Sequence, residues 1–169
     1  HAYEILEKHQ DVIKTFARIL QSKDIKENYY YIEVLQNAAR YYNRVGNIEE
    51  AIKHIKKAIK AIDKSNHDKH AELLSDLAGF YYDLNRKNKG IDIQEEVVKI
   101  RKTNFKNDDD KRKLAISLSN LIYYYDHNND SISSFYAKHD LMDNDYPLNS
   151  RRTYFYAYDT IMGSYTMAN

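Results

Sequence analysis

The chain has 169 residues, with 26 basic and 25 acidic side chains, a formal net charge of +1 and no cysteine. The balanced charge gives no long-range field to attract nucleic acid or an anionic membrane, and the lack of thiols excludes disulfides and thiol catalysis. Only 4 glycines and 1 proline interrupt the chain, which argues against many short strands, and no stretch approaches the roughly 20 apolar residues of a membrane span.

The predicted elements, taken in chain order, are all helices. The first is a helix over residues 2–22, where Ile5, Val12 and Phe16 belong to one apolar stripe at helical spacing. After a polar break, apolar helical patterns alternate with short polar segments. We therefore predict three helix pairs and a final half repeat, at residues 28–64, 68–103, 110–143 and 150–169.

One local pattern returns in each pair with a spacing of about forty residues. In the first copy it consists of Leu35, Ala38, Ala39, Tyr42, Gly46, Ala51, Ile55 and Ala58. The second copy has Leu74, Leu77, Ala78, Tyr81, Asn85, Gly90 and Val97, and the third has Leu118, Leu121, Ile122, Tyr125, Asn129, Ser134 and Leu141. The turn residues of successive copies are 39 and 44 positions apart. A period of this size is typical of stacked supersecondary units.

Packing explains why these residue types recur. The apolar positions of each first helix follow the i, i+3, i+4, i+7 rule, which places them on one face. Small residues such as Ala39 and Ala51 let two antiparallel helices approach closely. Tyr42, Tyr81 and Tyr125 occupy the packing position of the pattern, so we expect them in the core.

The first copy resembles a tetratricopeptide repeat in every motif position from Leu35 to Ala58. The spacing between copies is longer than the common repeat of about 34 residues. It resembles the spacing in the longer-loop repeats of kinesin light chains and related bacterial arrays. The second copy departs at Asn85 and Val97, and the third at Ile122 and Lys138. The resemblance implies an all-α, right-handed superhelical solenoid of antiparallel helix pairs, with about eight helices.

The resemblance also implies that the first helix of each pair lines a concave groove for peptides or partner proteins. Carried over by motif position, the ligand-binding candidates are Gln36, Arg40, Asn43, Ser75, Tyr82, Ser119, Asn120, Tyr123, Asp126 and Asp159. Neighbouring candidates are Glu33, Arg44, Glu72, Asp76, Asp83, His127 and Tyr156. Tyr82 and Tyr123 are the preferred pair, because tyrosine makes good contacts at interfaces. The carboxylate clamp of some family members is not reproduced.

Other chemistry has little support in the sequence. No Ser-His-Asp order, nucleophile elbow or phosphate loop is found, so we predict no catalytic residue and no cofactor. His67 and His70 lack a third ligand, which argues against a zinc site. Several lysines share one face of the second helix of the first pair, which we interpret as a solvated face, with an anionic partner as the alternative: Lys53, Lys56, Lys57, Lys60 and Lys64.

We therefore expect a non-catalytic protein- or peptide-binding scaffold, the partner-sensing region of a larger regulatory protein. The alternative is a receptor for a short signalling peptide in a bacterial regulator. We expect a protein or peptide partner, with no direct contact to nucleic acid or membrane. The cytoplasm is the expected compartment, with the periplasm left open. The pattern continues to Asn169 without a second helix, which indicates a fragment of a longer protein and predicts a homodimer through an exposed C-terminal stripe that includes Phe155, Tyr158 and Tyr165.

Overall fold

The computed structural model describes residues 2–22, 25, 30–63 and 65–143. Every regular element among these residues is a helix, as the sequence predicted. The helices are α1 (Ala2–Gln21), α3 (Tyr31–Arg44), α4 (Ile48–Ala61), α5 (His67–Asp83), α6 (Lys87–Thr103), α7 (Asp108–Asp126) and α8 (Ser131–Asp143). The predicted half repeat at 150–169, with its apolar stripe, lies outside the described residues.

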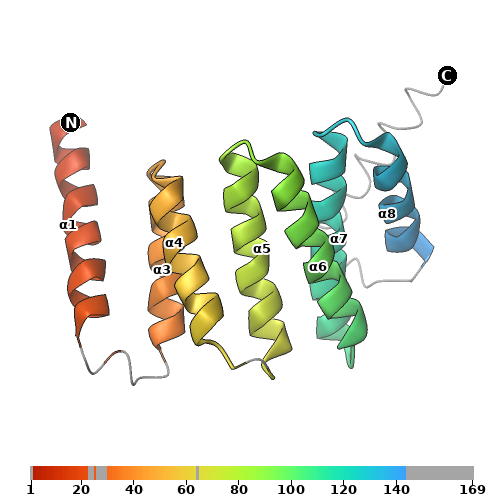
Figure 1. The fold of residues 1–169 in the computed structure, drawn as a ribbon, viewed down its shortest axis with the longest axis horizontal. Coiled ribbons are helices and arrows are strands. Elements are labelled where there is room, and N and C mark those ends of the chain that lie inside the picture. Colours follow the sequence, from red (N-terminus) through yellow and green to blue (C-terminus); the bar gives the residue numbers. More distant parts are fainter. Residues whose placement is uncertain (1, 23–24, 26–29, 64, 144–169) are drawn as a thin grey trace.

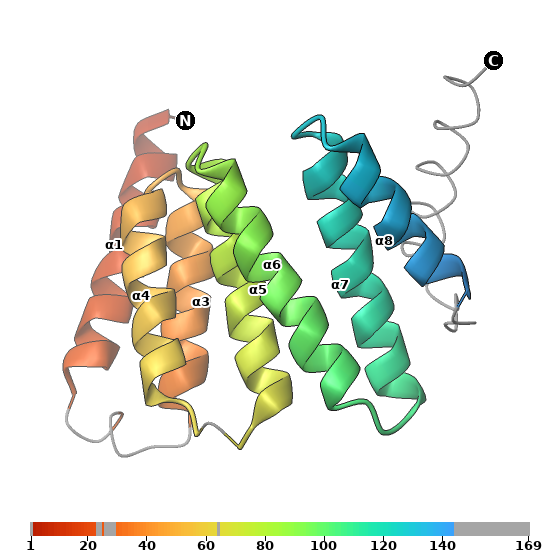
Figure 2. The same ribbon diagram turned by 45° about the vertical axis from the view of Figure 1, so that its right-hand side comes forward.

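The helices stand side by side in chain order, from α1 at one end of the row to α8 at the other (Figure 1). The closest neighbours are the predicted pairs α3–α4, α5–α6 and α7–α8, and each pair also packs against the next. The turned view shows the same succession of antiparallel helices (Figure 2). The predicted solenoid of antiparallel helix pairs is confirmed, and the seven helices of the described residues are close to the expected eight.

The turn inside each pair has the same backbone conformation. Gly46, Asn85 and Asn129 have φ angles of 82°, 58° and 59°, the left-handed region that glycine enters freely and asparagine tolerates. The N–H of the next residue then donates to the carbonyl of the motif tyrosine, as from Asn47 to Tyr42 at 2.9 Å. This bond closes the end of each first helix, because it satisfies a carbonyl that has no partner within the helix.

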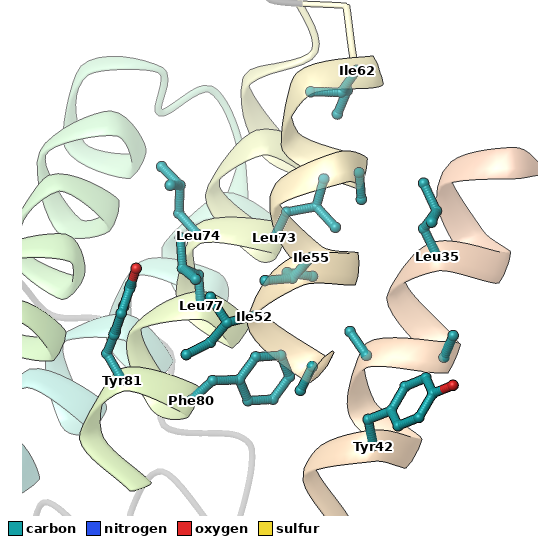
Figure 3. Close-up of a cluster of buried hydrophobic side chains, with 14 of the residues drawn as sticks. Leu35, Tyr42, Ile52, Ile55, Ile62, Leu73, Leu74, Leu77, Phe80 and Tyr81 are labelled. Carbon is teal, nitrogen blue, oxygen red and sulfur yellow. The ribbon is translucent and has the colours of Figure 1, made fainter. Parts of the chain in front are cut away.

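The core lies where the two helices of a pair meet each other and the following pair. Figure 3 shows side chains of α3, α4 and α5 converging, among them Leu35, Ile55 and Leu77. Ala39 and Ala51 are completely buried, and the three motif tyrosines are buried as expected. Small residues therefore set the distance between helices, and the large ones fill the space around the contact.

The later pairs keep this contact with different residues. Gly90 of α6 lies so close to α5 that a Cβ atom would be 2.8 Å from the Ala78 carbonyl oxygen. In the third pair Ile122 is buried although a small residue is expected there. Lys138 stands at an apolar motif position, and its ammonium group pairs with Asp126 at 3.3 Å. The departures from the motif thus change the local packing and leave the fold intact.

Candidate interaction surface

The first helices of the three pairs present one continuous surface, which we call the first-helix face. Its residues recur every three or four positions on each helix, and all of them are at least partly exposed. They are Glu33, Asn37, Arg40 and Arg44 on α3, Glu72, Asp76, Gly79 and Asp83 on α5, Ile116, Asn120 and Tyr123 on α7, and His127 directly after α7. The face has two junctions, one between α3 and α5 and the other between α5 and α7.

At the α3–α5 junction, Gln36 lies at the centre of a polar network. Its amide nitrogen donates to Glu72 at 2.9 Å and to Asp76 at 2.7 Å, and its oxygen accepts from Lys69 at 2.8 Å. The side chain is only 3% exposed. The sequence places Gln36 in a ligand groove, and this is wrong, because the neighbouring repeat supplies its hydrogen-bond partners and covers it.

Arg40 links the same two helices from the solvent side. Its guanidinium group donates to Asp76 at 2.8 Å and to Glu72 at 3.1 Å. Burial opposes the charged form, but these two carboxylates outweigh it, so the pKa of Arg40 is raised. Burial raises the pKa of Glu72, but hydrogen bonds from Gln36 and Lys69 and the charges of Lys69 and Arg40 lower it, and the net result is a decrease.

Asn43 extends the network toward the end of α5. Its amide nitrogen donates to the Asp83 carboxylate at 3.0 Å, while its own oxygen is buried without a partner. Asp83 itself is exposed, and this amide is the one partner that the structure gives it among the described residues. Arg40 and Asn43, both predicted as ligand contacts, thus have side chains that are hydrogen-bonded to residues of α5.

The α5–α7 junction is aromatic. Tyr82 stacks on Tyr124, with ring centroids 4.4 Å apart and planes 13° apart. Tyr123 lies beside both, 6.1 Å from the Tyr82 ring and 6.0 Å from that of Tyr124. The structure therefore brings together Tyr82 and Tyr123, the preferred pair from the sequence. Tyr123 is 44% exposed, whereas the Tyr82 hydroxyl is buried without a hydrogen-bond partner.

Charged and polar groups border this aromatic cluster. The His127 ring lies 4.0 Å from the Tyr123 ring and bonds through Nδ1 to the carbonyl oxygen of Tyr123. Lys87 lies over the Tyr82 ring at 5.7 Å and donates to the His127 carbonyl oxygen. Burial, followed by the Asp83 carboxylate, raises the pKa of Tyr124, so its hydroxyl is neutral at physiological pH.

The two predicted serines are hydrogen-bonded within the protein. Ser75 donates to Gln94 at 3.3 Å, and Gln94 in turn donates to the Ser117 carbonyl at 2.9 Å. Gln94 is fully buried, so it joins α5, α6 and α7 from inside. Ser119 is buried too and donates to the Ala115 carbonyl of its own helix. The sequence prediction that Ser119 faces the groove is therefore wrong.

The remaining predicted residues divide into three cases. Asn120 lies on the first-helix face and is partly exposed. Asp126 accepts hydrogen bonds from Ser134 and Lys138 of α8, so it is engaged within its own pair. Asp159 lies outside the described residues.

Two other features concern alternative functions. Among the residues that the structure describes, no cluster of three or more histidine or acidic side chains could hold a metal ion. In the same part of the chain, no helix combines the length and apolar character that crossing a bilayer requires.

The lysine face on α4 is exposed where described, with Lys53 paired to Glu50 at 2.9 Å.

Comparison with protein families finds two matches, both to tetratricopeptide repeat models, at residues 32–64 and 70–109. They coincide with the first two helix pairs and with the buried motif residues. This chain contains tetratricopeptide repeats. Tetratricopeptide repeats generally act as non-catalytic scaffolds for protein–protein interaction. No curated protein gives a significant match to the sequence.

Solved tetratricopeptide structures share the fold. BtubC (BKLC) from P. vanneervenii is 17% identical with a TM-score of 0.71, over 90% of this chain and 64% of that one. A P. anserina protein described as kinesin light chain with nearly identical TPR-like repeats is 15% identical with a TM-score of 0.66, covering 98% and 86%. The N-terminal domain of stress-induced protein-1 from C. elegans is 14% identical with a TM-score of 0.59, covering 83% and 99%. This chain thus spans just under two thirds of BtubC.

Sequence reasoning missed two contributors to this face. Lys69 contacts Glu33, Gln36 and Glu72 and holds the α3–α5 junction together. Gly79 lies one turn before the end of α5, at the motif position that Arg40 holds on α3 and Tyr123 on α7. A search for oppositely charged or hydrogen-bonding residues about one period apart would have found the contacts of the α3–α5 junction. Gln36 and Asp76, for example, are separated by 40 positions.

Proposed function

We propose that the first-helix face binds an extended segment of a protein partner, centred on the α5–α7 junction. The observation that carries this proposal is the exposed Tyr123 ring of α7, packed against Tyr82 and His127 at the α5–α7 junction. Aromatic rings at such positions supply a large contact area at low entropic cost, since few torsions have to be fixed.

The polar groups near Tyr123 support an extended ligand. Asn120 offers both donors and an acceptor, and the Asp83 carboxylate offers acceptors. An extended peptide needs both, because its own N–H and C=O groups have no partner within the segment. The α3–α5 junction supports this placement indirectly. Gln36 and Arg40 are already hydrogen-bonded to Glu72 and Asp76, so this junction has fewer polar groups to offer a ligand than the α5–α7 junction.

Two finer roles use the same face. In the first, the chain is the partner-sensing region of a larger regulatory protein and recognises a segment of a folded partner. In the second, it is the receptor for a short signalling peptide. A receptor for a short peptide should gain melting temperature when that peptide alone is added, by mass action. A scaffold should gain it only when the folded partner protein is added.

The test starts with a selection of random linear 12-residue peptides displayed on phage against the 169-residue chain. The affinity of the enriched peptides is then measured for the wild type, for Tyr123→Ser and for Tyr136→Ser. Tyr136 of α8 is 69% exposed and lies outside the first-helix face, so it is the matched control. We expect Tyr123→Ser to weaken binding about tenfold or more, as for a central aromatic contact.

The controls decide the outcome. Tyr136→Ser should bind the enriched peptides as the wild type does, and both variants should keep the helical circular dichroism of the wild type. If Tyr123→Ser binds as tightly as the wild type, or if both variants lose affinity equally, the first-helix face is not the binding site.

A further inference from the structure

The structure describes three glycines, and the reason why the position holds glycine differs among them. Gly46 has a φ of +82°, which disfavours any L side chain. Gly90 has no room for a side chain, because a Cβ atom would clash with the α5 backbone. Gly79 has neither reason: it lies within α5, and an added Cβ would meet only the Tyr124 hydroxyl, at an ordinary contact distance of 3.5 Å. Within the fold itself, nothing requires glycine at this position.

Glycine inside a helix is unfavourable, because its backbone loses more conformational freedom on folding than that of any other residue. Position 79 is also central to the first-helix face. The corresponding positions of the neighbouring repeats hold Arg40 and Tyr123, two large side chains that are both exposed. The missing side chain therefore leaves a low point between them on α5.

Carboxylates are placed around this low point. Asp76 precedes Gly79 by one helical turn and Asp83 follows it by one turn, so both share its side of α5. Asp76 is paired with Arg40 at 2.8 Å. Asp83 is exposed and accepts a single neutral amide, that of Asn43, among the described residues. The carboxylate of Asp83 thus lacks a cationic partner in the part of the chain that the structure describes.

Two cations near this site have other partners. Arg40 is shared between Asp76 and Glu72, and Lys87 donates to the carbonyl oxygen of His127. A planar guanidinium group matches a carboxylate in two parallel hydrogen bonds and also stacks on aromatic rings. A bound arginine would find both features here, in Asp83 and in the exposed Tyr123 ring.

We propose that Gly79 is the floor of a subsite for an arginine side chain of the bound segment, with Asp83 as its counter-charge and Tyr123 as its aromatic wall. This inference rests on the proposed function, and it names the chemistry that the face selects. It explains why a residue that disfavours the helix stands at a position where the fold has room for alanine.

The first experiment compares stability with binding. Gly79→Ala should raise the melting temperature by about 1–4 °C, because alanine lowers the conformational entropy of the unfolded chain and causes no clash in the helix. It should also weaken binding of an arginine peptide at least about fivefold, because the added methyl group takes up space in the subsite. Gly90→Ala is the matched control, and it should lower the melting temperature. The probe is the acetylated and amidated peptide Gly-Arg-Gly-Arg-Gly-Arg, followed by chemical-shift changes of the chain in solution.

The second experiment tests the charge. Asp83→Asn should weaken binding of the same peptide about tenfold, the range for a charged hydrogen bond, whereas Asp92→Asn changes the net charge equally on α6, away from this face, and should have little effect. A peptide with glutamate in place of arginine should not bind, and one with lysine should bind more weakly. The inference is overturned if Gly79→Ala binds as the wild type does, if Asp83→Asn and Asp92→Asn behave alike, or if the glutamate peptide binds equally well.

These outcomes separate the subsite from the face as a whole. If phage-selected peptides depend on Tyr123 but show no preference for arginine and no sensitivity to Gly79→Ala, the subsite is wrong and the interaction face stands. If Tyr123→Ser leaves the selected peptides unaffected while the arginine peptide still requires Gly79 and Asp83, the proposed function fails and the subsite is an isolated cation site.

Discussion

The two junctions of the first-helix face each join two successive first helices, yet they differ in character. Between α3 and α5, Gln36 and Arg40 bridge to the acidic residues Glu72 and Asp76. Between α5 and α7, the corresponding area holds Tyr82 and Tyr123 with an exposed aromatic edge. The comparison shows that this surface of a helical repeat can serve to fix neighbouring repeats or to present a contact area, depending on whether its polar groups find partners one period away.

The largest effect is expected from breaking the polar junction. Gln36→Ala should lower the free energy of unfolding by about 2–3 kcal/mol, because it empties a buried volume and removes hydrogen bonds to charged groups. Urea denaturation provides the measurement. Ser119→Ala changes the equivalent position of the third repeat, where the side chain bonds only to its own helix, so it should cost less than about 0.5 kcal/mol. Equal losses in the two variants would contradict the proposed difference between the junctions.

High pH should act on the aromatic junction. Burial, and then the Asp83 carboxylate, raises the pKa of Tyr124 above the ordinary value of 10.0. A raised pKa in the folded state means that its contribution to stability is complete below pH 10.0 and is lost as the pH rises above it. Between pH 10 and 11 the free energy of unfolding should therefore fall more steeply in the wild type than in Tyr124→Phe, by about 1 kcal/mol. Parallel curves for the two proteins would show that Tyr124 does not carry this dependence.

Low pH should act, more weakly, on the polar junction. Burial raises the pKa of Glu72, but hydrogen bonds from Gln36 and Lys69 and the nearby cations lower it overall below its ordinary value of 4.5. A lowered pKa in the folded state means that the stabilisation is present above pH 4.5 and is lost as the pH falls through the folded value. The effect is small because the carboxylate is partly exposed. Glu72→Gln should flatten the acid limb of the stability curve, whereas Glu96→Gln, an exposed change on α6, should not.

Most of the fold could be predicted from the sequence, because the motif describes packing. The small residues at 39 and 51, the motif tyrosines and the turn residues each have a local physical reason, and all take their expected places. Even the replacement of Gly46 by asparagine in later copies follows from backbone conformation, since asparagine tolerates the left-handed region.

The candidate site was less predictable, because exposure on this face depends on the neighbouring repeat. Tyr82 and Tyr123, which the sequence offers as ligand contacts, lie beside each other on adjacent first helices. Gln36 is covered because Lys69, Glu72 and Asp76 happen to match its amide. Asp126 turns to Lys138, a residue that stands at an unusual motif position. Such pairings depend on side chains far apart in sequence, and a single helix pattern does not reveal them.

The buried Gln94 has a consequence for how the array responds to mechanical load. Because it accepts from Ser75 on α5 and donates to the Ser117 carbonyl on α7, peeling α7 and α8 away would strand a polar amide in an apolar interior. The second and third repeats should therefore yield together when the chain is pulled from its ends, and the first repeat is held to the second by the apolar core that α3, α4 and α5 share.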